Sequence, residues 1–275
     1  SNMIYHYTSV DTLIKVLESQ SLWASDLTKM NDPHEFTAGL EILRELFSQS
    51  FPNSITWFDN NQVVGLNNQQ LLLGSSFSNE PDDLSQWRSY GDDGRGVVIG
   101  IDESILLSHN TITLHRFYKE DEKPVSYVHL FNVIYSKEEL AAKTRELFAS
   151  VDDFSNDRTE SFKLSLGISR LACSYKADFY RSENEVRAVV EHSKRSELYL
   201  EEDLKGLRPF DLKFRTSKYG LTAYCNLMLG LRENSAIKQV VLGPKCNVTT
   251  EELNFLLMAT GYRHVYVDKS KGNYR

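Results

Sequence analysis

Late in the chain, two carboxylates and a guanidinium occupy every second position, at Glu183, Glu185 and Arg187. Residues two apart lie on one face of a β-strand, so this spacing predicts that the three side chains point the same way. The opposite face of such a strand carries Asn184, Val186, Ala188 and Val190, and it is apolar enough to lie on a core. In a cleft, one of two neighbouring carboxylates has a raised proton affinity unless a cation or a ligand compensates. Such a site suits acid–base or cation-stabilising chemistry, whereas on an open strand edge the same residues form a ladder of ion pairs.

Three further polar side chains are expected at strand positions. Residues 3–8 predict a short strand that places His6 near its end, and Ser9 is a candidate cap for the helix that follows. Residues 71–78 predict a buried strand with Ser76 and Ser78 on one face. A histidine in a strand and serines beside backbone groups also serve purely structural roles, so both interpretations stay open.

The segment Asn31-Asp32-Pro33-His34-Glu35 has the composition of a helix start. Asp32 as the cap, Pro33 at the first helical position and Glu35 three residues after the cap form an Asp version of the capping box. We therefore interpret Asp32 and Glu35 as structural, with metal binding as the alternative role of their carboxylates.

Trp87 and Tyr90 lie three residues apart in a short helix that Asp82 or Asp83 is expected to cap. They share a face and form either a stacking wall or a packing contact in the core. The glycine-rich segment 91–96 precedes a strand at 97–101 and opens no helix, so it predicts a turn rather than a phosphate-binding loop.

Helices and strands are expected to alternate irregularly along the rest of the chain. Further strands are predicted at 22–25, 111–114, 125–128, 180–190, 208–215, 221–229, 238–242 and 264–267. Helices are predicted after Ser9, after Pro33, at 137–148, at 156–179 and around Leu253 to Leu257. The Asn- and Gln-rich stretch 51–70 predicts a loop. We expect a single α+β domain over residues 3–275, with residues 1–2 typical of a tag remnant.

Composition narrows the class of protein. The 275 residues are 41% hydrophobic and 25% charged, as in an ordinary globular protein, and no apolar run is long enough to cross a bilayer. The net charge of −7 gives no electrostatic footprint for nucleic acid. Cys173, Cys225 and Cys246 are far apart, which favours free thiols over disulfides or a zinc site. We expect a cytoplasmic protein.

Several short motifs follow one another in a fixed order. They are Tyr5-His6-Tyr7-Thr8, Asn31-Asp32-Pro33-x-Glu35, Trp87-x-x-Tyr90-Gly91 with Gly94-x-Gly96-Val97, Glu183-x-Glu185-x-Arg187, and Val241-Leu242-Gly243. Together they resemble a bacterial domain-of-unknown-function family that is often found near mobile elements and defence genes. The resemblance spans nearly the whole chain.

The opening strand and the late Glu motif are also similar to those of the NAD-dependent ADP-ribosyltransferase superfamily. That resemblance implies a split, mostly antiparallel sheet core with inserted helices, and NAD as a substrate. His6, Tyr7 and Thr8 match the first motif, which holds the nicotinamide carboxamide through backbone groups. Superfamily members with the other two motifs of this chain usually open with Arg instead of His.

The second and third motifs of the superfamily are matched as well. Ser76 and Ser78 fit its Ser-x-Ser form, and Tyr90 would be the aromatic residue that stacks on the ring. Glu183 and Glu185 fit its Glu-x-Glu form. Glu185 would stabilise the positive charge that develops on the ribose and hold a ribose hydroxyl, and His6 would hydrogen-bond a ribose hydroxyl as a neutral ring. Glu183 would bind or deprotonate the acceptor, whose identity the sequence does not give.

Three functional hypotheses follow. The first is an ADP-ribosyltransferase or NAD glycohydrolase, acting as a toxin or phage-defence effector. The second is a Mg²⁺-dependent nuclease or phosphoesterase that uses the carboxylates of Asp32, Glu35, Glu183 and Glu185. The third is a non-catalytic module that binds a nucleotide or a protein. The first requires His6 and Glu185 to meet in one cleft.

Overall fold

Strands from both ends of the chain meet in one sheet. The computed structural model describes residues 2–29, 33–61, 70–112, 125–194, 210–218 and 220–273. Its strands are β1 (Met3–Thr8), β2 (Ser21–Asp26), β3 (Gln70–Ser78), β4 (Val97–Asp102), β5 (Thr111–Ile112), β6 (Val125–Ser126), β7 (Val128–Asn132), β8 (Glu185–Ser193), β9 (Lys213–Ser217), β10 (Gly220–Met228), β11 (Ile237–Leu242) and β12 (Tyr266–Lys269).

Ten of these strands form the sheet in the described part of the chain. Its order is β12-β11-β4-β1-β3-β2-β10-β9, with β8 beside β3 and β7 beside β8, while β5 and β6 form a separate pair. Within these ranges β11 and β12 are the only named strands that pair in parallel. The predicted α+β class with a mostly antiparallel sheet is confirmed.

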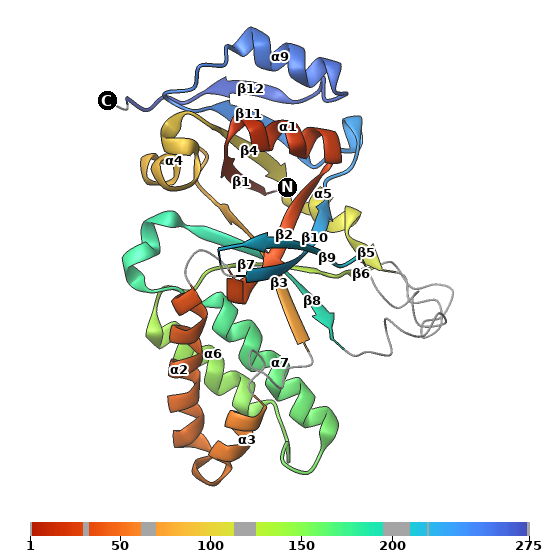
Figure 1. The fold of residues 1–275 in the computed structure, drawn as a ribbon. Coiled ribbons are helices and arrows are strands. Elements are labelled where there is room, and N and C mark those ends of the chain that lie inside the picture. Colours follow the sequence, from red (N-terminus) through yellow and green to blue (C-terminus); the bar gives the residue numbers. More distant parts are fainter. Residues whose placement is uncertain are drawn as a thin grey trace.

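Helices cover the sheet from separate sides (Figure 1). The α-helices are α1 (Val10–Ser19), α2 (Pro33–Ser50), α3 (Ile55–Asn60), α4 (Leu84–Tyr90), α5 (Glu103–His109), α6 (Lys137–Ala149), α7 (Arg158–Ser174) and α9 (Thr250–Ala259). Short 3-10 helices are η1 (Leu27–Lys29), η2 (Pro52–Ser54), η3 (Asp92–Gly94), η4 (Asp178–Glu183) and η6 (Arg232–Asn234). None of the helices in the described ranges combines the length and the apolar character that crossing a bilayer requires.

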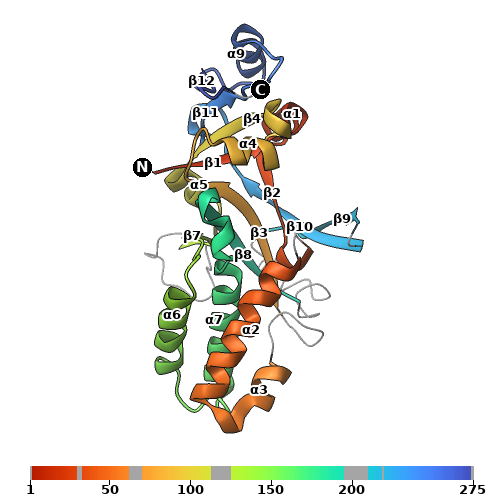
Figure 2. The same cartoon turned by 90° about the vertical axis from the view of Figure 1, so that its left-hand side faces the viewer.

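The sheet forks at β3. One edge of β3 pairs with β8 from residue 70 to residue 78. The other edge pairs with β1 at Ser78 and with β2 at Gly74 and Leu73. Two branches leave this edge: β1 continues to β4, β11 and β12, and β2 continues to β10 and β9. Figure 2 shows the β2–β10–β9 branch projecting to one side of the molecule. The stretch of β3 between the two contacts therefore faces a gap between the branches.

Alternating side chains hold β8 between two cores. Val186, Ala188 and Val190 belong to the larger core, which also contains α1 and α9 residues. Val189, on the other face, packs in a second core made largely by α2, α3, α6 and α7. This alternation agrees with the period of two expected for the strand, and it places Arg187 on the face of the helical layer.

The Glu183 segment differs from its prediction. We expected one strand over 180–190, but η4 ends at Glu183 and β8 begins at Glu185. Asn184 between them adopts the left-handed conformation with φ of 43°, which breaks the strand alternation. The prediction that Glu183 shares a strand face with Glu185 is therefore wrong, although both side chains still reach one site.

The 51–70 stretch also differs from the expected loop. Residues 52–60 form η2 and α3, and residues 62–69 lie outside the described ranges. Phe58 is buried, and the Trp57 ring stacks on Phe47 at 5.6 Å. Burial of these aromatic side chains outweighs the low helical propensity of the surrounding Asn residues.

Candidate functional site

A pocket opens at the fork of the sheet. It has a volume of about 300 Å³ and is lined by residues of β1, β2, β3, α4, η4, β8 and β9, together with Lys29, Glu35 and Lys176. The lining includes six of the residues predicted for the site: His6, Tyr7, Ser76, Tyr90, Glu183 and Glu185. His6 and Glu185, which are 179 positions apart in the sequence, thus line the same pocket.

Ser76 joins His6 to Glu185. Its carbonyl oxygen lies 3.0 Å from Nδ1 of His6, and its hydroxyl donates a 2.8 Å hydrogen bond to Oε1 of Glu185. The strand register places Ser76 opposite Arg187 on β8, so the serine side chain lies on the same face as the carboxylate. Because residues 75–77 of β3 face the gap between the branches, the imidazole occupies the place where a neighbouring strand would otherwise pair.

His6 is held as a neutral ring with a defined tautomer. Burial lowers the pKa of His6, and the hydrogen bond to the Ser76 carbonyl opposes only part of that shift. A carbonyl accepts and does not donate, so Nδ1 must carry the proton and Nε2 keeps its lone pair. The ring therefore offers an acceptor for a hydroxyl group, as the sequence interpretation required.

We expect the pKa of the His6 imidazole to lie below its ordinary value of 6.5. At pH values above that pKa, the ring should stay neutral with its proton on Nδ1. A pH series of imidazole ¹H–¹⁵N correlation spectra, with the signal assigned through His6→Gln, checks both points. Since the unfolded chain then binds the proton more readily than the folded one, the His6 contribution to stability decreases as the pH falls through 6.5. A midpoint above 6.5 would contradict this assignment.

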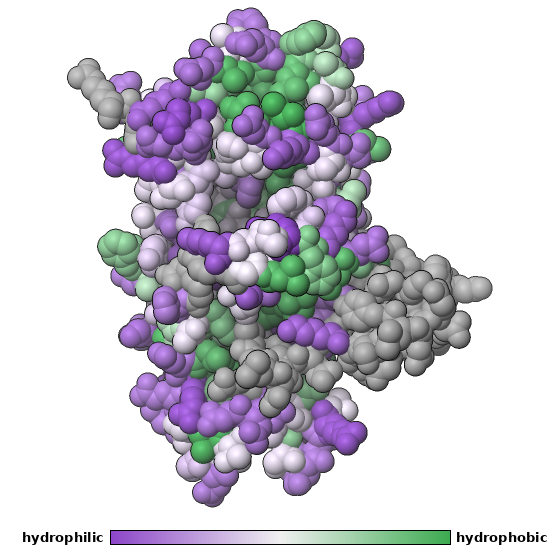
Figure 3. All heavy atoms as spheres, viewed as in Figure 1, coloured by the Kyte–Doolittle hydropathy of each residue, from purple (hydrophilic) through white to green (hydrophobic). Residues whose placement is uncertain are grey.

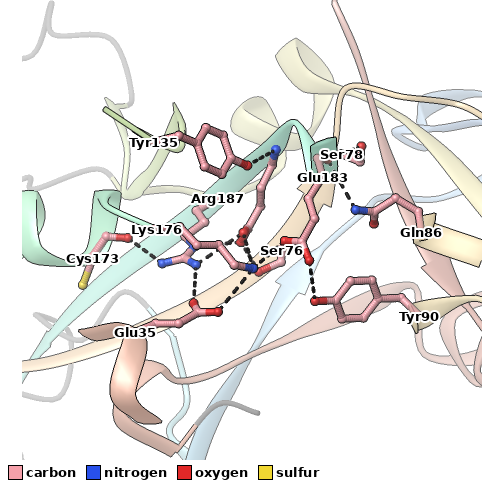
Figure 4. A network of polar contacts seen from close by, with 11 residues as sticks. Glu35, Ser76, Ser78, Gln86, Tyr90, Tyr135, Cys173, Lys176, Glu183 and Arg187 are labelled. Atoms are coloured by element: carbon pink, nitrogen blue, oxygen red, sulfur yellow. Dashed lines mark hydrogen bonds and ion pairs between the residues drawn. The ribbon is translucent and has the colours of Figure 1, made fainter. Parts of the chain in front are cut away.

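Five charged side chains form a linked cluster along one wall of the pocket (Figure 4). They are Glu35, Lys176, Glu183, Glu185 and Arg187. Arg187 pairs with Glu185 at 2.7 Å and with Glu35 at 2.9 Å. The Lys176 ammonium lies 3.2 Å from Glu185, 2.5 Å from Glu183 and 3.3 Å from Glu35. Three carboxylates against two cations leave the cluster with a net charge of −1.

Glu185 is ionised and fully hydrogen-bonded. Burial opposes its charge, but Arg187, Lys176 and the Ser76 hydroxyl together hold the pKa of Glu185 below its ordinary value. Each carboxylate oxygen accepts two bonds, Oε1 from Ser76 and Arg187, and Oε2 from Lys176 and Arg187. A carboxylate has about four acceptor positions, so its charge is available to a substrate while its hydrogen-bonding capacity is occupied.

Lys176 stays an ammonium ion. Burial opposes its charge, yet the carboxylates of Glu185, Glu183 and Glu35 raise the pKa of Lys176. It therefore acts as a fixed cation and not as a base or nucleophile at neutral pH. Among the residues that the structure describes, no group of three or more His, Cys, Asp or Glu side chains is arranged to hold a metal ion. Lys176 Nζ occupies the space between the three carboxylates.

Glu183 is the more accessible of the two motif carboxylates. It accepts bonds from Lys176 and from the Tyr90 hydroxyl, the latter at 3.3 Å. Its side chain is 14% exposed, against 6% for Glu185. Because fewer of its acceptor positions are used, Glu183 retains capacity to bind a further hydroxyl group.

The two aromatic residues of α4 have different roles. Trp87 is buried and packs edge-on against Tyr7, with ring centroids 5.0 Å apart. Tyr90 is 41% exposed as a whole residue and lines the pocket, where partial burial of its hydroxyl group raises the pKa of Tyr90 to about 12. The shared helix face predicted for them therefore divides into one core residue and one pocket residue. Asp83 caps α4, and Asp82 instead accepts from the Trp87 ring nitrogen.

Three of the predicted site residues are held by other parts of the fold. The Tyr7 hydroxyl donates to the Glu80 carbonyl at 2.6 Å, although its side chain still borders the pocket. Thr8 does not line the pocket, and a Cβ at Gly96 would approach its carbonyl oxygen to 2.1 Å, which explains the glycine there. The Ser78 hydroxyl donates to the Glu183 carbonyl at 2.8 Å and so positions the backbone of η4.

Sequence interpretation missed Lys176 and assigned Glu35 to capping. Lys176 follows the end of α7, where its backbone amide bonds to the carbonyl of Ile134. No residue within two positions of Lys176 belongs to one of the motifs, so the sequence pattern did not single it out. Glu35 lies in the first turn of α2 and points to Arg187. Its expected capping partner, Asp32, lies outside the described residues.

A comparison with protein families finds a match to the middle of the chain. Residues 86–188 match the family described as a protein of unknown function (DUF2971). This match supports the resemblance to a domain-of-unknown-function family over the stretch that carries Tyr90, Glu183, Glu185 and Arg187, and also Lys176. No curated protein and no solved structure matches the chain.

Proposed function

We propose that this protein binds NAD in the pocket at the sheet fork, cleaves the nicotinamide–ribose bond and transfers ADP-ribose to an acceptor. The observation that carries the proposal is the connection through Ser76 of a neutral His6 and an ionised Glu185 in one pocket. The order of the motifs along the chain adds support from resemblance alone.

The residue types suit each step of this reaction. As the C–N bond breaks, its electron pair leaves with nicotinamide, and the ribose becomes an oxocarbenium-like cation. The net negative cluster around Glu185 stabilises that cation through space, as a preorganised electrostatic group. Nε2 of His6 accepts a hydrogen bond from a ribose hydroxyl.

The acceptor completes the transfer at the same wall. Its hydroxyl attacks the anomeric carbon of the ribose and passes its proton to the Glu183 carboxylate; in a hydrolase, water attacks and its proton goes to the solvent. Glu183 is suited to bind that hydroxyl because it has unused acceptor capacity and is the more exposed carboxylate. A pocket of about 300 Å³ is at the lower end for a small-molecule site, so we assign it to the reacting half of the dinucleotide.

The two alternatives have less support. A Mg²⁺-dependent nuclease requires free carboxylates, but Lys176 and Arg187 pair with Glu35, Glu183 and Glu185. A non-catalytic nucleotide-binding module would use the same pocket, and only turnover separates it from the enzyme. The acceptor, and any toxin or phage-defence role, stay predictions from resemblance.

The deciding experiment measures NAD binding and nicotinamide release by the full chain. We expect NAD to raise the unfolding temperature, since a ligand at 100 times its dissociation constant stabilises by about 2.7 kcal/mol. Nicotinamide release, followed by chromatography, should exceed that of a protein-free control. Stabilisation without turnover, tested with protein, nucleic acid and water as acceptors, favours the binding module. Neither stabilisation nor turnover would overturn the proposal.

A further inference from the structure

The β2–β9 side of the pocket carries a cation outside the charge cluster. Arg215 of β9 lines the pocket together with Trp23 and Ser25 of β2. Its guanidinium lies over the Trp23 ring, with Cζ 5.5 Å from the ring centroid, and its Nη2 donates to the Ser25 hydroxyl at 3.2 Å. In the described part of the chain, no carboxylate pairs with Arg215. This differs from Arg187, which two carboxylates neutralise.

Arg215 also has an unused donor. Its Nε is the one side-chain nitrogen or oxygen, within the ranges described, that is buried without a hydrogen-bond partner. Such a donor carries a free-energy penalty, and an unpaired buried group often marks a place where an ion or ligand binds. Nε and Nη2 lie on the same edge of the guanidinium, which is the edge that binds two oxygens of a phosphate.

The two sides of the pocket therefore have opposite charge. The Glu185 wall has a net charge of −1, whereas Arg215 presents an unneutralised positive charge from the β2–β10–β9 branch of the sheet. A matching ligand has a cationic or cation-forming group at one end and an anionic group at the other. Figure 3 shows that apolar residues gather over β9 and β10 of this branch, where Phe214 and Leu221 are more than half exposed.

We propose that Arg215, with the Ser25 hydroxyl, binds the phosphate groups of the dinucleotide while Glu185 acts on its ribose. This inference rests on the proposed function for the identity of the dinucleotide. The Nε–Nη2 edge binds two phosphate oxygens and the Ser25 hydroxyl donates to a third. Trp23 fixes the guanidinium plane by the stacking contact. Arg215 thereby selects phosphorylated nucleotides over nucleosides.

Calorimetric titration with ADP-ribose, inorganic pyrophosphate and nicotinamide riboside, the unphosphorylated reacting half, tests this assignment. We expect Arg215→Ala to weaken ADP-ribose binding by about 10- to 100-fold, the loss of a charge-assisted bidentate contact, and to leave nicotinamide riboside binding unchanged. Arg215→Lys keeps the charge but lacks the planar edge, so its affinity for ADP-ribose should lie between those of the wild type and Arg215→Ala. Arg263→Ala, which removes an exposed arginine outside the pocket lining, is the matched control and should bind ADP-ribose like the wild type.

The outcomes separate this inference from the proposed function. If ADP-ribose binds through Arg215 but NAD is never cleaved, the phosphate site stands and the transferase proposal fails. If NAD is cleaved and Arg215→Ala leaves KM unchanged, the transferase stands and the phosphate site fails. Equal ADP-ribose affinity in Arg215→Ala and wild type, or no binding by the wild type, also overturns it. If Arg215→Ala fails to fold, Ser25→Ala provides a second test, with a smaller expected loss of affinity for ADP-ribose.

Discussion

Glu185→Gln is expected to lower the rate of nicotinamide release by about 10²- to 10³-fold, because it removes the negative charge that stabilises the ribosyl cation. The glutamine retains an oxygen that accepts from Ser76. The substitution also brings the charge cluster from −1 to zero, with Lys176 and Arg187 balanced by Glu35 and Glu183, so we expect the variant to fold. Steady-state kinetics of nicotinamide release measure the effect, which should appear in kcat more than in KM.

Two matched variants make the same change of charge at other positions of the cluster. Glu35→Gln removes a carboxylate of α2 that lies outside the Glu-x-Glu motif, and it should lower the rate far less. Glu183→Gln should reduce transfer to the acceptor while nicotinamide release in water continues. Equal losses in all three variants would show that only the net charge of the cluster matters, and would remove the special role assigned to Glu185.

Arg187→Met is expected to lower the free energy of unfolding by about 3–5 kcal/mol at neutral pH, the usual cost of breaking a buried ion pair by removing one partner. Within the cluster, the change leaves Lys176 as the cation that pairs with Glu185, and it takes the net charge of the cluster to −2. It also removes the 2.7 Å bond from Arg187 to the Cys173 carbonyl, which connects β8 to the end of α7. Urea unfolding gives the free energy, provided the slope m is unchanged.

The control for this loss is an exposed arginine of the same helical layer. Arg170 pairs with Glu191 on β8, but its side chain is 47% exposed, so Arg170→Met should cost within about 1 kcal/mol. The double variant Arg187→Met/Glu185→Met removes both charges of the buried pair and should be more stable than Arg187→Met alone. A cost for Arg187→Met as small as that for Arg170→Met would mean that Lys176 suffices to hold Glu185.

Acid should weaken the same cluster in a predictable direction. The folded-state pKa of Glu185 is depressed below its ordinary value of 4.5, so its contribution to stability is present above 4.5 and is lost as the pH falls through the lower, folded value.

Short sequence patterns were sufficient to predict several structural features of the fold. Ser9 caps α1 as expected, and its hydroxyl accepts from the Thr12 amide at 3.1 Å. The alternation of Ser76 and Ser78 on one face of β3 is confirmed by their register opposite Arg187 and Glu185. The three cysteines are free, as their spacing indicated. The first two of these features depend on residues within a few positions of one another.

Features that depend on tertiary contacts were not predictable from periodicity. Lys176 gains its role only because the end of α7 meets Ile134 and comes beside η4, and no residue pattern near it signals this. Glu35 fitted a capping motif, yet Arg187 from β8 determines where its carboxylate points. Nor does the sequence reveal that β1 and β2 share one edge of β3, which creates the pocket.

The pairing of β3 with β8 also bears on how this chain can be shortened for experiments. The segment that matches the family begins at residue 86, whereas β3, which lies against β8 along its length, ends at Ser78. A recombinant fragment cut to residues 86–188 would leave one side of β8 without its neighbouring strand, and would also lack His6 and Ser76. Such a fragment is expected to aggregate through its bare strand edge, so biochemical work requires the intact polypeptide.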